Sequence, residues 1–145
     1  MVSQNGSATG GGGVLARSSS LQTGAGDTPL SPTSNEISGN TFGIQGTQNS
    51  FVDLRGGLSV TGSKFTGVVV DTGSRLQTRD NTISANGAHG IFAGRASSVE
   101  FFGAANIVSG NVAWGLFCAD GESSHSGNVA GVTGNTLGQV SCTGF

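Results

Sequence analysis

The chain has 145 residues, of which 34% are hydrophobic and only 10% are charged, with 27 glycines and a formal net charge of −2. So few positive charges leave no basic face for a phosphate backbone, which excludes nucleic acid from the expected partners. No apolar run approaches the ~18 residues of a membrane-spanning helix. Hydrophobic residues recur in register, which argues against disorder and indicates one domain over residues 1–145.

The first twelve residues have no basic start and no continuous apolar core, so they do not predict a secretory signal peptide. Val2 and Asn5 already fit a repeat that continues along the chain. A solenoid normally needs a polar cap over its first rung. We therefore expect either a fragment of a longer secreted protein or a small protein that is capped by association.

An N-x-[IV]-[ST] segment provides the clearest repeat. Its apolar residue recurs, after a longer first interval, every 23 to 25 residues, at Val2, Ile37, Val60, Ile83, Val108 and Val132. Three residues after each of these come Asn5, Asn40, Ser63, Asn86, Asn111 and Asn135. We interpret the Asn positions as structural. Asn tolerates the unusual backbone angles of a sharp turn, and stacked amides can bond to one another.

Two further repeated strands complete each unit. A G-[VIL]-x-[VAC] strand begins at Gly13, Gly43, Gly67, Gly90 and Gly115, with a looser copy at Gly138, and a Ser-rich strand is centred on Leu21, Val52, Leu76 and Val99. Glycines would cost about 1 kcal/mol each inside a helix, and the apolar runs are short and alternating, so strands are predicted. Units that cannot bury a face alone predict a β-solenoid, here of about six coils.

The N-x-I-S-x-N turns, the G-I-x-V strands and the coil length resemble the right-handed parallel β-helix of the pectin-lyase-like superfamily. The resemblance covers nearly the whole chain, from Val2 to Cys142, and implies an all-β, right-handed fold with three short strands per coil. It implies little about activity, because the superfamily includes polysaccharide lyases, glycoside hydrolases, epimerases, phage tailspikes, adhesins and non-catalytic surface repeats.

One interval of the repeat is longer than the others, and the excess lies in residues 24–34. Both prolines of the protein, Pro29 and Pro32, fall in this stretch. Proline lacks the N–H that a parallel ladder needs, so a protruding loop is predicted. In β-helices of this class longer loops wall the binding groove, but a tolerated surface insertion explains the same feature.

The outward positions of the Gly-initiated strand form an apolar column: Leu15, Gln45, Val69, Phe92, Phe117 and Ser141. Such a stripe predicts a covering surface, which could be a sugar ring stacked on Phe, a partner protein, a second copy of the chain, or the 24–34 loop folded back. We take Phe92, Phe117, Val69 and Gln45 as candidate binding residues, together with Gln77 from the adjacent column.

That adjacent column contains Gln22, Asp53, Gln77 and Glu100. Asp53 and Glu100 would stand two coils apart, roughly 9–10 Å between backbones, a spacing compatible with the acid and base of an inverting glycosidase. Asp71 and Asp120 are a weaker pair. Acidic residues on outward strand positions more often serve solvation, so no catalysis is expected from these residues.

Other catalytic signatures of the resembling families are missing. Residues 87–90, Gly-Ala-His-Gly, match the G-H-G element of glycosidases of this fold only in a distorted form. The sequence also has no acidic cluster of the kind that a calcium-dependent lyase needs. His89 and His125 have no nucleophile or metal-ligand partner at a recognisable spacing, and His89 is interpreted as packing at a turn near Trp114. The sequence predicts neither a metal nor a cofactor.

A hydroxyl-bearing file runs along the N-x-[IV]-[ST] strands, with Ser59, Thr61, Thr82 and Ser84 flanked by Ser38, Ser109 and Thr133. Regular hydroxyls on a flat solenoid face could order water, in which respect alone the chain resembles ice-binding solenoids. Glu36, Ile107 and Gly131 interrupt the pattern. Ser and Thr are also ordinary residues for solvent-facing strand positions.

Cys118 and Cys142 are one coil apart, both at inward positions of the Gly-initiated strand. Stacked positions at about 4.8 Å lie within reach of a disulfide. The bridge would staple the last coil and would imply an oxidising compartment, whereas two free buried thiols remain the alternative.

Together these patterns predict a secreted module, or one on a cell or virion surface, that presents a side face to a polysaccharide or a protein partner without catalysis of its own. The alternative is a carbohydrate-active enzyme, or a fragment of one, that acts as an inverting glycoside hydrolase or a polysaccharide lyase. An ice-binding solenoid is a minor alternative.

Overall fold

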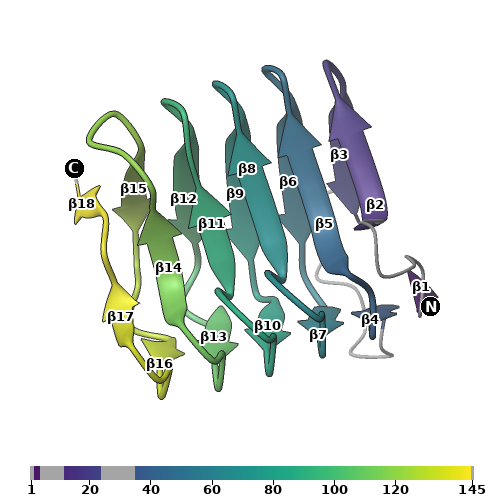
Figure 1. Cartoon of the computed structure of the whole chain (residues 1–145), viewed down its shortest axis with the longest axis vertical. Coiled ribbons are helices and arrows are strands. Elements are labelled where there is room, and N and C mark those ends of the chain that lie inside the picture. Colours follow the sequence, from purple (N-terminus) through teal and green to yellow (C-terminus); the bar gives the residue numbers. More distant parts are fainter. Residues whose placement is uncertain (1, 4–11, 24–34, 145) are drawn as a thin grey trace.

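The computed structural model describes residues 2–3, 12–23 and 35–144, and these form a solenoid of parallel β-strands with no helix. Figure 1 shows the strands stacked in rungs, with the chain passing through three sheets in each turn. About four turns lie wholly within residues 35–131, and partial first and last rungs flank them. The predicted all-β solenoid with three short strands per coil is therefore confirmed.

The three sheets are named A, B and C in the order in which the chain meets them. Sheet A contains β1 (Val2–Ser3), β4 (Asn35–Ser38), β7 (Leu58–Thr61), β10 (Thr82–Ser84), β13 (Ile107–Ser109) and β16 (Val132–Thr133). Sheet B contains β2 (Gly12–Arg17), β5 (Phe42–Thr47), β8 (Val68–Asp71), β11 (Ile91–Ala93), β14 (Trp114–Cys118) and β17 (Gly138–Val140). Sheet C contains β3 (Ser20–Thr23), β6 (Phe51–Arg55), β9 (Arg75–Arg79), β12 (Ser98–Phe102), β15 (Ser124–Gly127) and β18 (Thr143–Gly144).

The strand register is the one that the repeat predicts. In sheet A, Ile83 pairs with Val60 on one side and with Val108 on the other. The same alignment joins the apolar centres of sheets B and C, so each inward position stacks on its counterpart one turn away. The resulting apolar core includes Ile44, Val52, Val60, Leu76, Ile91, Val99, Val108 and Leu116. A slip of one residue would turn these side chains to solvent, so core burial specifies the register.

A buried amide ladder joins the rungs between sheets A and B. The Asn86 carbonyl oxygen Oδ1 accepts a hydrogen bond from the Ser63 N–H at 3.0 Å. The backbone N–H and side-chain amide of Asn86 donate to Oδ1 of Asn111 at 3.1 and 2.9 Å. Asn111 repeats both bonds with Asn135, at 3.1 and 2.8 Å. The predicted structural ladder, to which the buried Asn40 also belongs by position, is confirmed.

The expectation that Asn adopts the unusual backbone angles at this corner is wrong. The left-handed residue is the one before it: Gly39, Gly62, Gly110 and Gly134 have φ between 60° and 64°. Ala85 takes the same position in the fourth rung with φ 54°. The preceding residue turns the chain, so Asn keeps an ordinary backbone and can direct its amide into the ladder.

Ala85 is therefore strained, and we expect Ala85→Gly to stabilise the protein. A left-handed conformation costs an L-residue roughly 1–2 kcal/mol, which exceeds the roughly 0.4–1 kcal/mol that a more flexible unfolded chain costs. The expected gain in the free energy of unfolding is about 0.5–1 kcal/mol in denaturant titrations. Gly134→Ala is the matched reverse change, because a Cβ there meets no atom within 4 Å, and it should destabilise by a similar amount. Equal stabilities for all three proteins would contradict this interpretation.

Two more buried ladders were not foreseen from the sequence. At the corner between sheets B and C, the backbone N–H of each serine donates to the hydroxyl of the next, at 3.1 to 3.2 Å, through Ser50, Ser74, Ser97 and Ser123. At the corner between sheets C and A, Oδ1 of Asn81 accepts from the Leu58 N–H at 3.1 Å, and Asn106 accepts from Asn81 at 3.4 Å. Polar ladders thus satisfy the backbone where the strands end.

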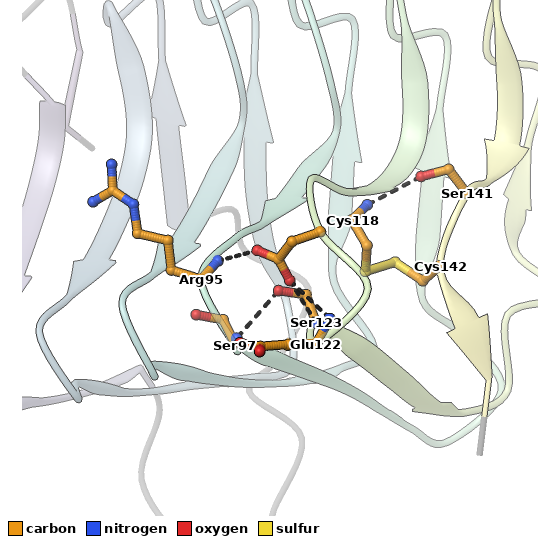
Figure 2. Close-up of a disulfide and its surroundings, with 8 residues drawn as sticks. Arg95, Ser97, Cys118, Glu122, Ser123, Ser141 and Cys142 are labelled. Atoms are coloured by element: carbon orange, nitrogen blue, oxygen red, sulfur yellow. Dashed lines mark hydrogen bonds between the residues drawn. A yellow bond between two sulfur atoms is a disulfide. The ribbon is translucent and has the colours of Figure 1, made fainter.

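A disulfide joins Cys118 of β14 to Cys142, with a Cα–Cα distance of 4.9 Å (Figure 2). The same pair of rungs is also joined by the Cys118 N–H, which donates to the Ser141 hydroxyl at 3.0 Å. The predicted staple of the last coil is confirmed. A disulfide is compatible with an extracellular protein and gives weak support to that location.

Three predictions concern residues outside the part of the chain that the structure describes. They are the protruding loop at 24–34, the position of Asn5 in the amide ladder, and the state of the first rung around residues 4–11. These remain predictions.

Candidate functional site

Aromatic side chains gather on the outer face of sheet B. One column consists of the residues that precede the repeated glycines of the sheet B strands: Phe42, Thr66, His89 and Trp114. The next outward column contains Leu15, Gln45, Val69, Phe92 and Phe117, paired in register. These two columns supply the rings of this face, which is here called the aromatic face.

The rings of the aromatic face contact one another. His89 stacks on Phe117 with ring centroids 4.6 Å apart and an interplanar angle of 11°. Phe92 lies 6.0 Å from Phe117, and Trp114 lies 6.5 Å from it, both in tilted arrangements. Phe42 packs at 5.4 Å against Phe65, which comes from the corner beside the sheet. Contacts of this kind hold the rings in a fixed arrangement.

A hollow of about 360 Å³ lies between these two groups of rings. Its lining consists of Phe42, Phe65, Thr66, Val69, Ala88, His89 and Phe92. Phe65 is the most open of its rings, with 43% of its surface exposed. Ligand sites typically occupy ~300–1,000 Å³, are mostly apolar and contain a few polar groups. This hollow is at the lower end of that range and is widely open, so it could hold one ring of a larger ligand against the surface.

His89 supplies one of the two polar side chains of the hollow. Its Nδ1 accepts a hydrogen bond from the backbone N–H of Trp114 at 3.4 Å. Burial lowers the pKa of His89 below its ordinary value, so the ring is neutral at pH 7. With Nδ1 as the acceptor, the proton of the neutral ring is on Nε2, which makes Nε2–H a hydrogen-bond donor.

The comparisons with known proteins identify no family. A scan against protein-family models gave no match, and searches of curated proteins and of solved structures gave none either.

The five candidate binding residues do not share one face. Phe92, Phe117, Val69 and Gln45 lie on the outer face of sheet B, as their spacing predicts. Gln77 lies on β9 of sheet C, where its amide donates to the Glu100 carboxylate at 2.9 Å. The same surface also contains four residues that were not predicted to belong to it: Phe42, Phe65, His89 and Trp114.

The carboxylates of Asp53 and Glu100 are each paired with an arginine. Asp53 is only 5% exposed and accepts from Nε of Arg55 at 2.6 Å. Glu100 accepts from the Arg75 guanidinium. Hydrogen bonds from Arg75, and then from Gln77, hold the pKa of Glu100 below its ordinary value. Glu100 is therefore ionised at neutral pH and does not provide the protonated carboxyl group that a general acid requires.

Asp71 and Asp120 lie at the corner between sheets B and C and both contact Arg95. The Arg95 guanidinium lies 3.2 Å from the Asp71 carboxylate, and the Arg95 backbone N–H donates to Asp120. A hydrogen bond from Ser123 is the main cause that lowers the pKa of Asp120. Because the folded pKa of Asp120 lies below its unfolded value, the hydrogen bonds to Asp120 stabilise the fold at neutral pH and are lost on acidification. The pair has a structural role in this turn.

The hydroxyl file lies on the outer face of sheet A. Ser38, Thr61, Ser84, Ser109 and Thr133 are paired in one register across five rungs. Glu36 and Ile107 interrupt the neighbouring column, as the sequence indicates, and Ile107 is exposed. The face is regular in one column only.

In the part of the chain that the structure describes, no three side chains of His, Cys, Asp or Glu are grouped so that they could hold a metal ion. Within the same residues, no helix has the length and apolarity needed to cross a bilayer.

Proposed function

We propose that the chain is a binding module that holds a polysaccharide on the aromatic face and has no catalytic activity of its own. The observation that carries this proposal is the group of contacting rings on sheet B, in particular His89, Phe92, Trp114 and Phe117. A sugar ring has an apolar C–H face and a polar rim of hydroxyls. It can cover an aromatic ring while its hydroxyls remain hydrated or bonded.

The charge distribution favours a neutral polysaccharide over a charged one. Apart from Asp71, at the outward C-terminal end of β8, the outward positions of β5, β8, β11 and β14 carry no acidic, lysine or arginine side chain. The ionisable residues Asp71, Arg95 and Asp120 lie at the corner toward sheet C, where they contact one another. Away from that corner, a charged sugar on the aromatic face would lose hydration without gaining an ion pair.

We also propose a more specific fold and location for the protein. A right-handed β-helix of six coils related to the pectin-lyase-like superfamily would agree with the three parallel sheets and their register. The disulfide between Cys118 and Cys142 supports a secreted protein or one on a cell or virion surface. A protein partner or a second copy of the chain is the other candidate cover for an apolar face, and the binding test below separates these occupants.

Substitution of the rings tests the proposal. Phe92→Ala and Phe117→Ala should each weaken retention on neutral polysaccharides by about tenfold or more, as measured by affinity gel electrophoresis, because each removes a stacking ring. Both residues are only partly buried, so unfolding free energies should fall by only about 1 kcal/mol. Phe102→Ala is the matched control, since Phe102 is a partly buried phenylalanine on the outer face of sheet C.

Retention that is unchanged in both sheet B variants would contradict the proposal. So would retention by no polysaccharide together with concentration-dependent dimers that Phe92→Ala abolishes, because the cover would then be a second copy. Release of reducing sugars from a bound glycan, abolished by Asp53→Asn or Glu100→Gln, would instead support the enzyme alternative.

A further inference from the structure

The hollow beside His89 has features that the rest of the aromatic face lacks. It is a shallow, open depression, it is lined by rings from different rungs, and two polar residues, Thr66 and His89, are among its lining residues. Specificity in ligand sites comes from a few polar groups placed among apolar ones. The hollow is therefore the part of the face best suited to distinguish one sugar from another.

His89 is held in one orientation by contacts on two sides. Its ring lies on the Phe117 ring, and its Nδ1 accepts the Trp114 N–H. Nε2 has no hydrogen-bond partner among the described residues and is not one of their buried unpartnered atoms, so it remains accessible. An accessible N–H donor in the lining of an apolar hollow is matched by an acceptor oxygen on the ligand.

Resting on the function proposed above, we infer that the hollow is a subsite for one neutral sugar ring, and that Nε2–H of His89 donates a hydrogen bond to an oxygen of that ring. Phe65 and Phe92 provide the apolar walls against which the C–H face lies. His89 is thus a specificity-determining residue of the aromatic face.

A neutral sugar ring is favoured over a charged one because none of the lining residues carries an ionised side chain. Burial keeps His89 uncharged at neutral pH. Lys64, on the corner segment of the preceding rung, contacts a lining residue: its Nζ lies 5.6 Å from the centroid of the Phe65 ring, but Lys64 does not line the hollow. A uronate carboxylate in the hollow would be desolvated without a bonded partner.

Acidification should weaken the subsite. Protonated imidazole carries N–H groups on both nitrogens, so Nδ1 would face the Trp114 N–H as a second donor. Among the elements packed against His89, β11 has no titratable side chain, β14 has only the disulfide-bonded Cys118, and β8 has Asp71 at its far end. A loss of binding on acidification that the His89 variants remove therefore points to His89.

The test uses the full chain with cellohexaose, mannohexaose and hexagalacturonate as probes, titrated by calorimetry at pH 7 and pH 5. At least one neutral hexaose should bind, at least about tenfold more tightly than hexagalacturonate, with weaker binding at pH 5. His89→Phe should weaken that binding by about tenfold, the factor expected for one hydrogen bond, and should remove the pH dependence. His89→Gln, which keeps a donor but does not titrate, should bind more tightly than His89→Phe and without the pH dependence.

His125→Gln is the matched control, because His125 is the other histidine and lies on β15 of sheet C. It should leave both the affinity and the pH profile unchanged. Unchanged binding by His89→Phe at both pH values, with binding still lost in Phe92→Ala, would overturn the subsite and leave the proposed function intact. Tighter binding of hexagalacturonate that Lys64→Ala abolishes would overturn the neutral class, and binding unaffected by Phe92→Ala would refute the function itself.

Discussion

We expect Asn111→Ala to lower the free energy of unfolding by about 3–5 kcal/mol, enough to unfold a domain of marginal stability. The Asn111 side chain is fully buried and takes part in four hydrogen bonds. Its Oδ1 accepts from the backbone and the amide of Asn86, and its own amide donates to Ile83 and Asn135. Alanine removes these partners and leaves two buried donors of Asn86 unsatisfied.

Asn128→Ala is the matched control for this prediction. Asn128 is exposed, and its side chain accepts one local hydrogen bond, from the Ala130 N–H at 2.9 Å. Its loss should cost about 1 kcal/mol or less, because water replaces the missing partner. Chemical denaturation followed by circular dichroism measures both variants. Equal losses in the two would mean that the buried ladder contributes no more than an exposed turn.

The second large effect is expected for Gly90→Ala, which should destabilise the protein by about 3 kcal/mol or more. A Cβ at Gly90 would lie 2.7 Å from the Asn111 amide nitrogen and 2.8 Å from the carbonyl oxygen of Gly115. Neither atom is the end of a flexible side chain, since the first belongs to the ladder and the second to the backbone. The rung must therefore move away from the ladder and weaken it.

Gly121→Ala controls for the general effect of replacing glycine. A Cβ at Gly121 meets nothing within 4 Å, and its φ lies outside the left-handed region. This variant should keep the wild-type unfolding midpoint or raise it slightly, because alanine reduces the freedom of the unfolded chain. If Gly90→Ala also kept the wild-type midpoint, the close approach between the glycine file and the Asn ladder would be refuted.

The contacts behind these two predictions explain why the fold could be predicted from the sequence. Nearly every rung contributes an apolar centre, an Asn three residues later and a glycine shortly after that. The structure makes the three interdependent, because the missing Cβ of Gly90 leaves room for the side chains of Val108 and Asn111. A solenoid repeats the same local problem in every turn, so the same solution recurs in the sequence.

The Ser and Asn ladders at the other two corners were missed for a physical reason. Serines at positions 50, 74, 97 and 123 recur at the repeat length, but serine is also common on exposed strands and turns. Spacing alone does not show that these hydroxyls point inward to the backbone of the previous rung. The repeat of serines is visible in the sequence, but only their burial in the structure shows that they form a ladder.

The candidate site was predicted only in part. The outward column with Phe92 and Phe117 follows from alternation along the strand. His89 and Trp114 were missed because each file glycine was taken as the start of its strand, whereas the residue before the glycine also faces outward. Phe65 reaches the same surface from the corner, and no strand periodicity predicts that position.

Trp114 allows the most direct measurement, because it is the only tryptophan in the chain and lies on the aromatic face beside Phe117. We would titrate the protein with a panel of neutral and acidic oligosaccharides and follow its emission and its quenching by acrylamide. The account predicts a saturable change in emission and reduced quenching with at least one neutral member of the panel. Full binding of a glycan that leaves both signals unchanged, or no response to any member, would contradict polysaccharide binding on this face.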